Sequence, residues 1–479
     1  MANLWVKKSL SSLLAQAADS EKGLKRTLGA VNLVALGIGA IIGAGLFVRT
    51  AAASAEAAGP AVTLSFVVAA IGCAFAGLCY AEFAAMIPIA GSAYTYAYAT
   101  MGEFVAWIIG WALVLEYALG AVTVSIAWSE YLNKLVGGSI PYEWCHSPFE
   151  ISPNGVSGMM NLPAILILFL LSMLLIKGTE ESARVNTIIV FIKVSIVLIF
   201  IAVGYQFINP ANHTPYFMPQ GPGHMEWNKW GYGGVLGGAA IVFFAFIGFD
   251  AVSTAAQEAK NPAKDMPIGI LGSLVVCTIL YVLFSYVLTG VANYTEFQTA
   301  GKEASVAYAI TNHMPGYGWL ATAVTVAILA GFSSVILVML LGQSRVFYSM
   351  SHDGLIPKVF SELHPKFRTP YKSNWILFAF SGILAAFLPG SMAGDLTSFG
   401  TLLAFVLVSL GIWLLRRSDP DQPRPFKAPL VPLVPILGAV ICLAMIVALD
   451  KYTLMTALAW MALGVFIYFG YSQKNSKLQ

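Results

Sequence analysis

Charged side chains are scarce in this sequence. Asp, Glu, Lys and Arg make up only 10% of its 479 residues, whereas hydrophobic residues make up 58%. Soluble domains carry roughly 25% charged residues, so this chain has too little polar surface to coat a water-soluble globule. Its mean hydropathy of +0.77 agrees. The scarcity of charge therefore excludes a soluble protein and indicates a polytopic membrane protein.

The sequence also lacks the signatures of several kinds of chemistry. The net charge of +3 is small and the basic residues form no tract, which argues against a nucleic-acid partner. There is no G-x-x-x-x-G-K-S/T loop to bind ATP and no nucleophile–base pair to suggest an enzyme. We expect no cofactor. Neither a disulfide framework nor a metal site is expected from five scattered cysteines: Cys73, Cys79, Cys145, Cys277 and Cys442.

Long apolar runs, in contrast, are abundant. A membrane-spanning helix needs about 20 mainly apolar residues, and the sequence contains twelve such runs, separated by Pro, Gly, Asn and charged residues. They cover roughly residues 29–57, 60–88, 103–132, 161–178, 184–206, 232–257, 267–292, 317–349, 374–390, 395–416, 430–449 and 452–472. The sequence therefore predicts an all-α protein with about twelve transmembrane helices.

The basic residues are distributed unevenly between the loops. With the N-terminus inside, 20 of the 26 Lys and Arg residues fall on the inner side, five on the outer side, and one, Lys193, within a span. Positive residues favour the cytoplasmic side of a membrane. The sequence therefore predicts a multi-pass protein of the cell membrane, with cytoplasmic segments at residues 1–28 and 473–479.

Glycines interrupt the first and the sixth spans. Four glycines lie within residues 37–45 of the first span, and Gly248 lies in the sixth. Because each glycine costs a helix interior about 1 kcal/mol relative to Ala, we predict a break in the first helix at Gly43–Gly45. This point lies about 20 Å from the inner end at 1.5 Å per residue, near the middle of the membrane. Interrupted spans in two oppositely directed halves are typical of inverted repeats with a binding site between them.

Such a break has two interpretations. Unwinding frees backbone N–H groups, which attract a carboxylate, and backbone carbonyls, which attract an ammonium group. Alternatively, small residues such as Gly37, Ala40 and Gly45 let helices pack closely without any ligand. The matching interruption at Ile247-Gly248 in the sixth span favours the ligand site.

Five ionisable residues fall within the predicted spans: Glu82, Glu116, Lys193, Asp250 and Arg345. A charge in lipid is costly, so each must face protein or water. Lys193 and Glu116 are predicted at similar depths, where they could form a static ion pair or Lys193 could carry a proton. We expect Asp250 to cap the inner half of the sixth span and Arg345 to anchor the eighth at the cytoplasmic face. Glu82, near the inner end of the second span, could act as a gate or could merely form an ion pair.

Four stretches carry motifs that are specific enough to compare with a known family. They are Gly37–Phe47, CYAEFAAMIPIAGSAYTYAY (79–98), FFAFIGFDAVSTAAQEAKNPAKDMPIGI (243–270) and GQSRVFYSMSHDGLIPKVF (342–360). In this order they resemble the amino acid–polyamine–organocation superfamily. Within it the chain is most similar to the bacterial cationic amino acid transporter family, over residues 25–470. The resemblance implies inverted five-helix repeats at 29–206 and 232–416, with discontinuous first and sixth helices, and two further helices at 430–472.

The resemblance also implies a binding site for an α-amino acid between the unwound parts of the first and sixth helices. The Gly43-Ala44-Gly45 segment would bind the carboxylate of the amino acid. The backbone amides of Ala44 and Gly45 would contact it directly. Its ammonium group would bind three backbone carbonyls, those of Ile41, Phe244 and Ile247.

Two side chains gain a role from the same resemblance. Lys193 matches a fifth-helix lysine that stands where sodium-coupled relatives of this fold hold a sodium ion, which implies that protons drive transport. Glu116 matches a third-helix acidic position near the substrate side chain. One departure concerns Ala44, because the family usually has Gly-Thr-Gly here. The missing hydroxyl removes a possible hydrogen-bond partner for Lys193.

The leading interpretation is a proton-coupled amino acid symporter that works by alternating access in the lipid bilayer. The second is an amino acid exchanger or polyamine carrier that uses the same site. The third, from a different class, is an amino acid-sensing receptor with a transporter fold. The residues leave open whether the preferred side chain is neutral or cationic. They also leave open the oligomeric state, an accessory subunit and whether Cys145 is free.

Overall fold

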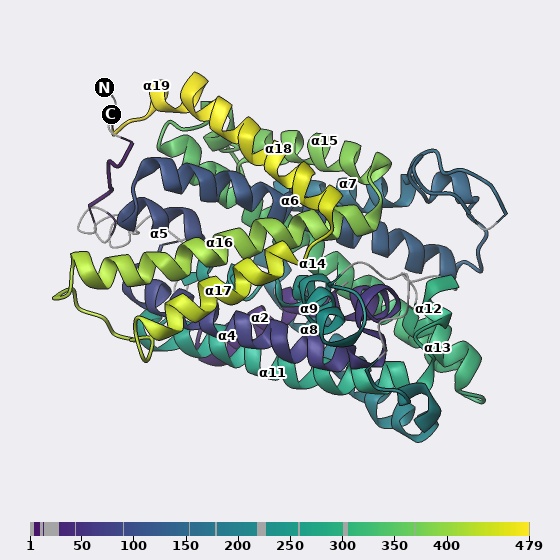
Figure 1. Cartoon of the computed structure of the whole chain (residues 1–479). Coiled ribbons are helices and arrows are strands. Elements are labelled where there is room, and N and C mark those ends of the chain that lie inside the picture. The colour runs from purple at the N-terminus through teal and green to yellow at the C-terminus, as the bar shows by residue number, and fades with distance from the viewer. Residues whose placement is uncertain are drawn as a thin grey trace.

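The computed structural model describes residues 4–9, 13, 28–43, 45–89, 91–152, 154–177, 180–217, 227–256, 259–299, 305–367 and 369–478. Regular structure in these ranges is helical, apart from isolated β-bridges between Leu28 and Ala259 and between Ile151 and Ser157. Figure 1 shows the long helices running roughly side by side across the molecule. The all-α architecture predicted from the apolar runs is confirmed.

The helices follow the predicted runs closely. The first part of the chain forms α2 (Ala30–Ile41), α3 (Thr50–Ala53), α4 (Val62–Met86), α5 (Ser92–Thr100), α6 (Glu103–Leu135), α7 (Leu162–Lys177) and α8 (Glu180–Gly204). The second part forms α9 (Gly231–Val242), α10 (Ala251–Thr254), α11 (Pro262–Val291), α12 (Glu296–Thr299), α13 (Ser305–His313), α14 (Gly318–His352), α15 (Tyr371–Phe387) and α16 (Gly390–Ser418). The chain ends with α17 (Leu433–Val447), α18 (Lys451–Ile467) and α19 (Gln473–Asn475).

These helices suit a membrane. Within the described residues, eight helical stretches are long and apolar enough to span one, and α2, α7 and α17 are shorter apolar helices. Each of the twelve predicted runs overlaps one or more helices. The chain is therefore a polytopic membrane protein. The division into repeats at 29–206 and 232–416 stays a prediction.

Local chemistry explains where individual helices begin. Pro262 occupies the first turn of α11, where its missing N–H leaves no hydrogen bond unmade. The Asp265 carboxylate reaches back to accept from the N–H of Asn261 at 2.9 Å, as in a capping box. At the start of α18, the Asp450 side chain accepts from the N–H of Tyr452 at 2.9 Å. Short polar side chains thus satisfy the free N–H groups of these helix starts.

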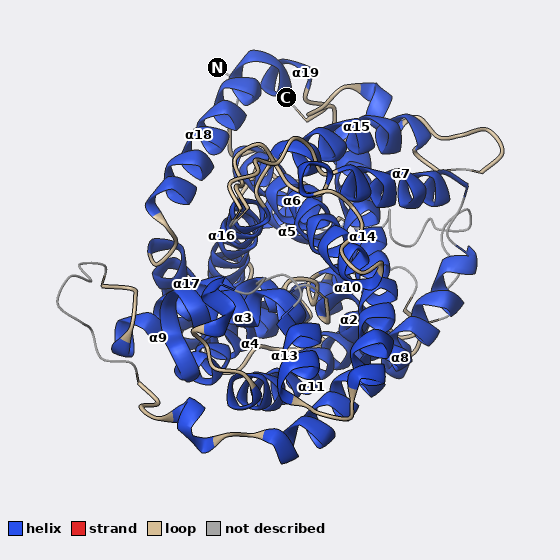
Figure 2. Cartoon of the chain, turned by 90° about the vertical axis from the view of Figure 1, so that its right-hand side faces the viewer, coloured by secondary structure: helices blue, strands red, loops and turns tan. Residues whose placement is uncertain are grey.

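Helix α6 lies at the centre of the packing. It contacts α14 and α16, while α11 packs against α4 and α2. The most apolar window of α6 is 83% buried, whereas that of α18 is only 22% buried, so α18 lies at the periphery. Figure 2, seen along the helices, shows α2 and α10 near the middle of the molecule and α18 at its rim. The central helix α6 carries the buried Glu116, whereas the buried Lys193 lies on α8, whose most apolar window is only 28% buried.

Both ends of the chain lie at the same end of the molecule, on the left of Figure 1. Lys8 Nζ lies 2.5 Å from Asp353 Oδ1 just after α14, and Tyr94 OH donates to the other carboxylate oxygen at 2.6 Å. The N–H of Lys477 donates to the Asp353 carbonyl at 3.1 Å. We call this end the terminal face. The end that carries α12 and α13 is the opposite face.

The connection between α6 and α7 packs against the opposite end of α6. Cys145 is buried here and is a free thiol, which answers a question that the sequence left open. Burial raises the pKa of this thiol to about 11. Burial opposes protonation of His146, but the Glu130 carboxylate, 2.8 Å from Nε2, outweighs it and raises the pKa of His146. This connection is therefore an ordered structure rather than a loose loop.

Glu82 forms a buried ion-pair network near the terminal face. Its carboxylate accepts from Arg416 Nε at 3.0 Å and Nη2 at 2.6 Å, and from the N–H of Ala428 at 2.8 Å. Arg424 Nε lies 3.3 Å from the same carboxylate. Of the two roles that the sequence left open for Glu82, the structure shows pairing. One carboxylate joins α4, α16 and the segment that leads to α17.

We predict that Glu82→Leu destabilises the protein by roughly 3 kcal/mol, because it leaves Arg416, whose side chain is 24% exposed, and the buried side chain of Arg424 without their counterion. The measurement is thermal unfolding of the purified protein in detergent. Glu362→Gln is the control, since Glu362 pairs with Lys372 while both side chains are more than 40% exposed, and such surface pairs contribute about 0–1 kcal/mol. Equal melting temperatures for the two variants would contradict a structural role for the network.

Candidate functional site

The first helix is broken where its glycines predicted a break. Helix α2 ends at Ile41, and Ile42 is extended with ψ 104°. The chain becomes helical again as a π-helix from Gly45 to Arg49, whose first N–H groups use the Gly43 carbonyl. Ala44 lies outside the described residues. The N–H and C=O groups around this break have lost their regular helical partners.

The sixth helix is broken at the matching place. Helix α9 gives way to a 3₁₀ turn at Phe243–Phe246, Ile247 is extended with ψ 134°, and α10 begins at Ala251. Gly248 has φ +115°, in the left-handed region that glycine tolerates best. Both discontinuous helices predicted from the sequence are therefore present.

The two breaks touch each other. A Cβ atom built on Gly45 would overlap the backbone of Ala245, and one built on Gly248 would lie 2.9 Å from the carbonyl carbon of Ala40. A Cβ on Gly37 would overlap Ser273 of α11. These glycines thus allow close packing at the breaks, whether or not a ligand also binds there. Glycine is needed here both to interrupt the helices and to let them meet.

Lys193 binds the break of the first helix. It is 1% exposed, and its Nζ donates to the carbonyls of Gly39 at 2.7 Å and Ile42 at 2.9 Å. Gly331 of α14 makes room for the stem, because a Cβ there would lie 2.8 Å from Lys193 Cδ. One ammonium group therefore replaces two helical N–H donors that the break has removed.

Of the two interpretations left open for Lys193, the static ion pair with Glu116 is not the arrangement found. The Lys193 ammonium contacts backbone carbonyls, whereas the charged group acting on Glu116 is the Asp250 carboxylate. Sequence depth placed the two residues at one level but could not give the direction in which each helix turns its side chain. In place of a Lys–Glu ion pair, the structure has two separate arrangements. The Lys193 ammonium group binds backbone carbonyls, and the Glu116 carboxyl group lies beside that of Asp250.

Asp250 belongs to this acid pair rather than to a helix cap. Its backbone is already helical, at φ −68° and ψ −30°, and its side chain does not cap α10, because a capping residue needs extended geometry. Instead its carboxylate accepts from Tyr117 OH at 2.7 Å and from the N–H of Gly248 at 3.3 Å. The expected cap is therefore wrong, and Asp250 links the sixth-helix break to α6.

Glu116 completes the pair from α6. It is fully buried, and neither carboxylate oxygen has a hydrogen-bond partner among the described residues. A buried polar atom without a partner is uncommon and needs a reason, such as a ligand or an exchangeable proton. Glu116 therefore stays a candidate for proton binding, now with Asp250 as its neighbour.

Tyr281 is a site residue that sequence reasoning missed. Its hydroxyl lies 2.9 Å from the carbonyl oxygen of Ile41 and 2.8 Å from that of Ala245. One side chain of α11 thus bridges both breaks. A single tyrosine within an apolar run carries no periodic signal, so the sequence could not have distinguished Tyr281 from the other buried tyrosines.

The breaks are covered toward the opposite face. Arg49, just past the first break, forms an ion pair with Asp395 at the start of α16. Ser305 Oγ donates to the Phe47 carbonyl at 2.8 Å, and Gln298 Nε2 donates to the Ala55 carbonyl at 2.9 Å. The segment with α12 and α13 is therefore attached directly to the outer half of the first helix.

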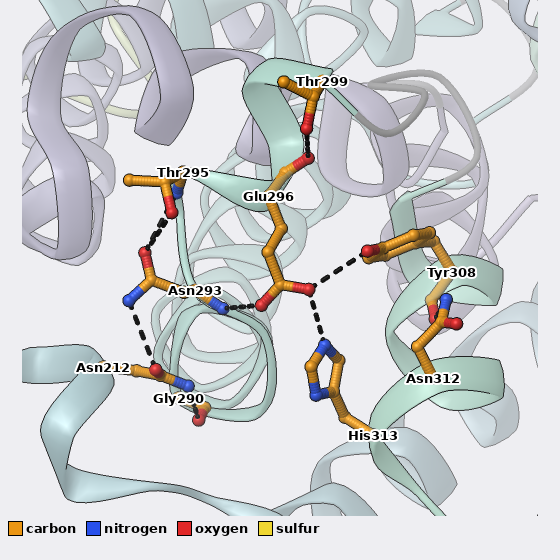
Figure 3. A network of polar contacts seen from close by, with 9 residues as sticks. All are labelled: Asn212, Gly290, Asn293, Thr295, Glu296, Thr299, Tyr308, Asn312 and His313. Atoms are coloured by element: carbon orange, nitrogen blue, oxygen red, sulfur yellow. Dashed lines mark hydrogen bonds and ion pairs between the residues drawn. The ribbon is translucent and has the colours of Figure 1, made fainter.

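A polar network holds α12 and α13 together (Figure 3). Glu296 accepts from His313 Nε2 at 2.7 Å, from Tyr308 OH at 3.1 Å and from the N–H of Asn293 at 2.9 Å. Burial of this carboxyl opposes its ionisation, but these donors outweigh burial and lower the pKa of Glu296. The network fixes the cover over the opposite side of the breaks.

Polar contacts also cover the terminal side. Ser253 Oγ of α10 donates to Ser92 Oγ of α5 at 3.3 Å. Arg345 Nη1 donates to Thr254 Oγ1 at 3.5 Å, so Arg345 connects α14 with α10, and its anchoring at the cytoplasmic face stays a prediction. The breaks are therefore enclosed from both faces.

Comparison with known proteins identifies relatives along the whole chain. A sequence model described as "Amino acid permease" matches residues 28–468. The branched-chain amino acid permease BcaP of Bacillus subtilis is 46% identical over 98% of both chains. The methylthioribose transporter of the same organism is 40% identical over the full length of both chains. The vacuolar cationic amino acid transporter 4 of Arabidopsis thaliana is 34% identical over 88% of this chain and 68% of its own.

We predict that Gly45→Ala lowers stability by about 2 kcal/mol, because the new methyl group overlaps the Ala245 backbone and forces the two breaks apart. Thermal unfolding in detergent measures the change. Gly77→Ala is the matched control, since a Cβ at Gly77 of α4 meets its nearest atom at 3.5 Å. An unchanged melting temperature for Gly45→Ala would show that the breaks do not depend on this close approach.

Proposed function

The chain belongs to the amino acid permease family, and we propose that it imports an L-amino acid by proton-coupled symport with alternating access. The observation that carries the proposal is the position of Lys193. Its ammonium group binds carbonyls on both sides of Ile41, at the break where the substrate is expected. A titratable cation thus controls the same backbone that would form the binding site.

The proposed binding site uses backbone groups at both breaks. The N–H groups of Gly43 and Gly45 lie where the outer half of the first helix begins, and a helix N-terminus favours a carboxylate. Ala44, between them, keeps the role that the family resemblance implies. The carbonyls of Ile41, Phe244 and Ile247 would bind the substrate ammonium group. The Ile41 carbonyl already faces Tyr281, but a carbonyl oxygen has two lone pairs and can accept a second donor.

The proposed coupling follows from the donors of Lys193. A charged lysine has three N–H donors, and two of them bind carbonyls of the first helix. After loss of its proton, the neutral amine binds those carbonyls less strongly, because charge-assisted hydrogen bonds are roughly twice as strong as neutral ones. Protonation of Lys193 would therefore hold the first helix in place and deprotonation would release it. Glu116 is proposed as a second proton site.

The proposed orientation places the terminal face in the cytoplasm of the cell. This face carries both chain ends, and most of the basic residues of the sequence belong to the loops predicted on that side. The Arg49–Asp395 ion pair then closes the extracellular side, and the contact of Ser253 with Ser92 closes the cytoplasmic side. Alternating access requires these covers to open in turn.

We predict that Lys193→Met loses pH-gradient-driven accumulation, by about tenfold or more, while its substrate affinity changes far less. Methionine keeps most of the stem and removes the titrating group. The measurement is uptake into proteoliposomes with an imposed inward proton gradient, alongside ligand-induced thermal shift. Lys134→Met, an exposed lysine at the end of α6, is the control. Proton-driven accumulation by Lys193→Met would exclude Lys193 as the coupling residue.

The substrate class is tested by competition for uptake. We predict that α-amino acids compete and that primary amines without a carboxylate compete at least about tenfold more weakly, since they lose the bonds to the backbone amides. Strong competition by a polyamine would favour the carrier alternative. Methylthioribose belongs in the panel, because a relative of equal length is named as its transporter.

The same proteoliposomes distinguish symport from exchange and from sensing. A symporter accumulates substrate in response to the proton gradient when the vesicles contain no amino acid. An exchanger takes up substrate only when an amino acid is loaded inside. A receptor binds substrate but produces neither flux.

A further inference from the structure

Buried polar atoms without hydrogen-bond partners occur mainly in the terminal half of the protein. They include Tyr80 OH, Tyr96 OH, both Glu116 oxygens, both polar atoms of Gln343 and Ser409 Oγ, and all five side chains are 0% exposed. Among the described residues, fewer such atoms lie toward the opposite face, one of them Ser129 Oγ. The two halves of the protein thus differ in how completely their buried polar groups are satisfied.

These side chains lie at successive depths from the terminal face. Tyr80 lies six residues before the end of α4, and Glu116 lies 13 residues after the start of α6. At 1.5 Å per residue these depths are about 9 Å and about 20 Å. Tyr96 belongs to α5, which connects the terminal-side ends of α4 and α6. The unpartnered groups therefore extend from the acid pair toward the terminal face.

Neighbouring groups connect them. The ring of Tyr80 packs edge to face on that of Phe249, the residue before Asp250, with centroids 5.9 Å apart. It also packs edge to face on the ring of Tyr96, with centroids 6.3 Å apart. Tyr96 lies one helical turn after Ser92 in α5, and Ser253 Oγ donates to Ser92 Oγ at 3.3 Å. A row of hydroxyl groups thus begins beside the acid pair and follows the sixth helix toward α5.

The row ends at a strained residue. Ser253 Oγ donates to Ser92 Oγ at 3.3 Å, and Ser92 has φ +51° at the start of α5. A positive φ is uncommon for residues other than glycine, and such strain persists only where the surroundings impose it. The geometry therefore holds a hydroxyl group at the terminal-side end of the row.

The acid pair supplies a proton to this row. Glu116 and Asp250 are both fully buried, and no basic side chain forms an ion pair with either among the described residues. Tyr117 gives the pair one hydroxyl donor, at 2.7 Å. Two carboxyl groups that share a buried site without a counterion cannot both be ionised. The pair therefore holds at least one exchangeable proton.

We propose that the hydroxyl groups of Tyr80, Tyr96, Ser253 and Ser92, bridged by water, form the cytoplasmic half of a proton path from the Glu116–Asp250 pair. The proposal rests on the proposed proton-coupled transport. In each step a hydroxyl or water oxygen accepts a proton on a lone pair and releases another of its protons to the next oxygen. The acid pair becomes more negative by one charge, and the proton leaves into the cytoplasm.

Water is the bridging group that this chemistry favours. An unpaired buried hydroxyl or carboxylate is costly, lipid offers no donor to relieve it, and internal water commonly binds two to four such groups. A water-bridged path also explains why Tyr80 and Tyr96 are tyrosines among aromatic neighbours. Phe83 stacks on Tyr96 at 4.9 Å and Phe405 packs on Tyr80 at 5.3 Å, so the rings would pack equally well as phenylalanines.

The test removes the two hydroxyl groups and keeps the rings. In proteoliposomes, Tyr80→Phe with Tyr96→Phe should lower the initial rate of proton-driven uptake about tenfold or more. Exchange of external for internal substrate at equal pH on both sides should stay within about twofold, because exchange needs no net proton release. Tyr98→Phe is the control. It also lies in α5 and is fully buried, but its hydroxyl already donates to Glu103 at 2.7 Å.

The other outcomes overturn the proposal in distinguishable ways. Unchanged driven uptake in the double variant, with the Lys193→Met effect intact, would place the path elsewhere and leave the transport mechanism standing. An equal fall in driven uptake and exchange would assign the hydroxyl groups to folding. Wild-type transport without any proton dependence would remove the proposed coupling and the path together. The melting temperature of each variant shows whether it is folded. If the double variant is unfolded, the same uptake and exchange measurements are made on Tyr80→Phe and on Tyr96→Phe.

Hydration is tested separately from transport. After replacement of the native cysteines, Ser253→Cys should react with a small water-soluble thiol reagent that has access from the terminal face. A buried serine with a satisfied hydroxyl, Ser125 of α6, whose Oγ donates to the Val122 carbonyl at 2.7 Å, provides the control as Ser125→Cys. Equal and negligible labelling of both cysteines would contradict a hydrated path.

Discussion

The rest of the site depends on the contact between the Lys193 ammonium group and the carbonyls of the broken first helix. A helix cannot stop inside a membrane unless its freed backbone groups find partners, since no bulk water is available there. Lys193 supplies donors for Gly39 and Ile42, and Tyr281 supplies one that lies within reach of Ile41 and Ala245. The breaks exist because side chains of α8 and α11 replace the missing helical bonds. On the proposed mechanism, the conformation of the first helix depends on the protonation of Lys193.

The site contains a buried cation and two buried carboxyl groups, and the cation forms no ion pair with the carboxyl groups. The cation on α8 contacts backbone dipoles, and the carboxyl groups of α6 and the sixth helix contact each other. Had Lys193 and Glu116 formed an ion pair, each would have neutralised the other, and neither would exchange a proton easily. Their separation leaves both available for the proton binding that we propose.

Sequence reasoning predicted features that depend on local composition. The apolar runs predicted the helices, and the glycines of residues 37–45 together with Gly248 predicted both breaks. It failed where the direction of a side chain matters. The pairing of Lys193 and the role of Asp250 depend on the rotation of each helix about its axis, which residue depth does not determine. Tyr281 was missed because it differs from other buried tyrosines only in the two carbonyls it meets.

The depth of Lys193 has an electrical consequence. It lies 13 residues into α8, a helix of 25 residues, and hence near the middle of the membrane. On the proposed orientation, a proton that reaches it from outside has crossed about half of the transmembrane voltage, worth roughly 1 kcal/mol per 100 mV. A negative cell interior would then load this lysine even when the pH is equal on both sides. Membrane potential alone could therefore supply part of the driving force for uptake.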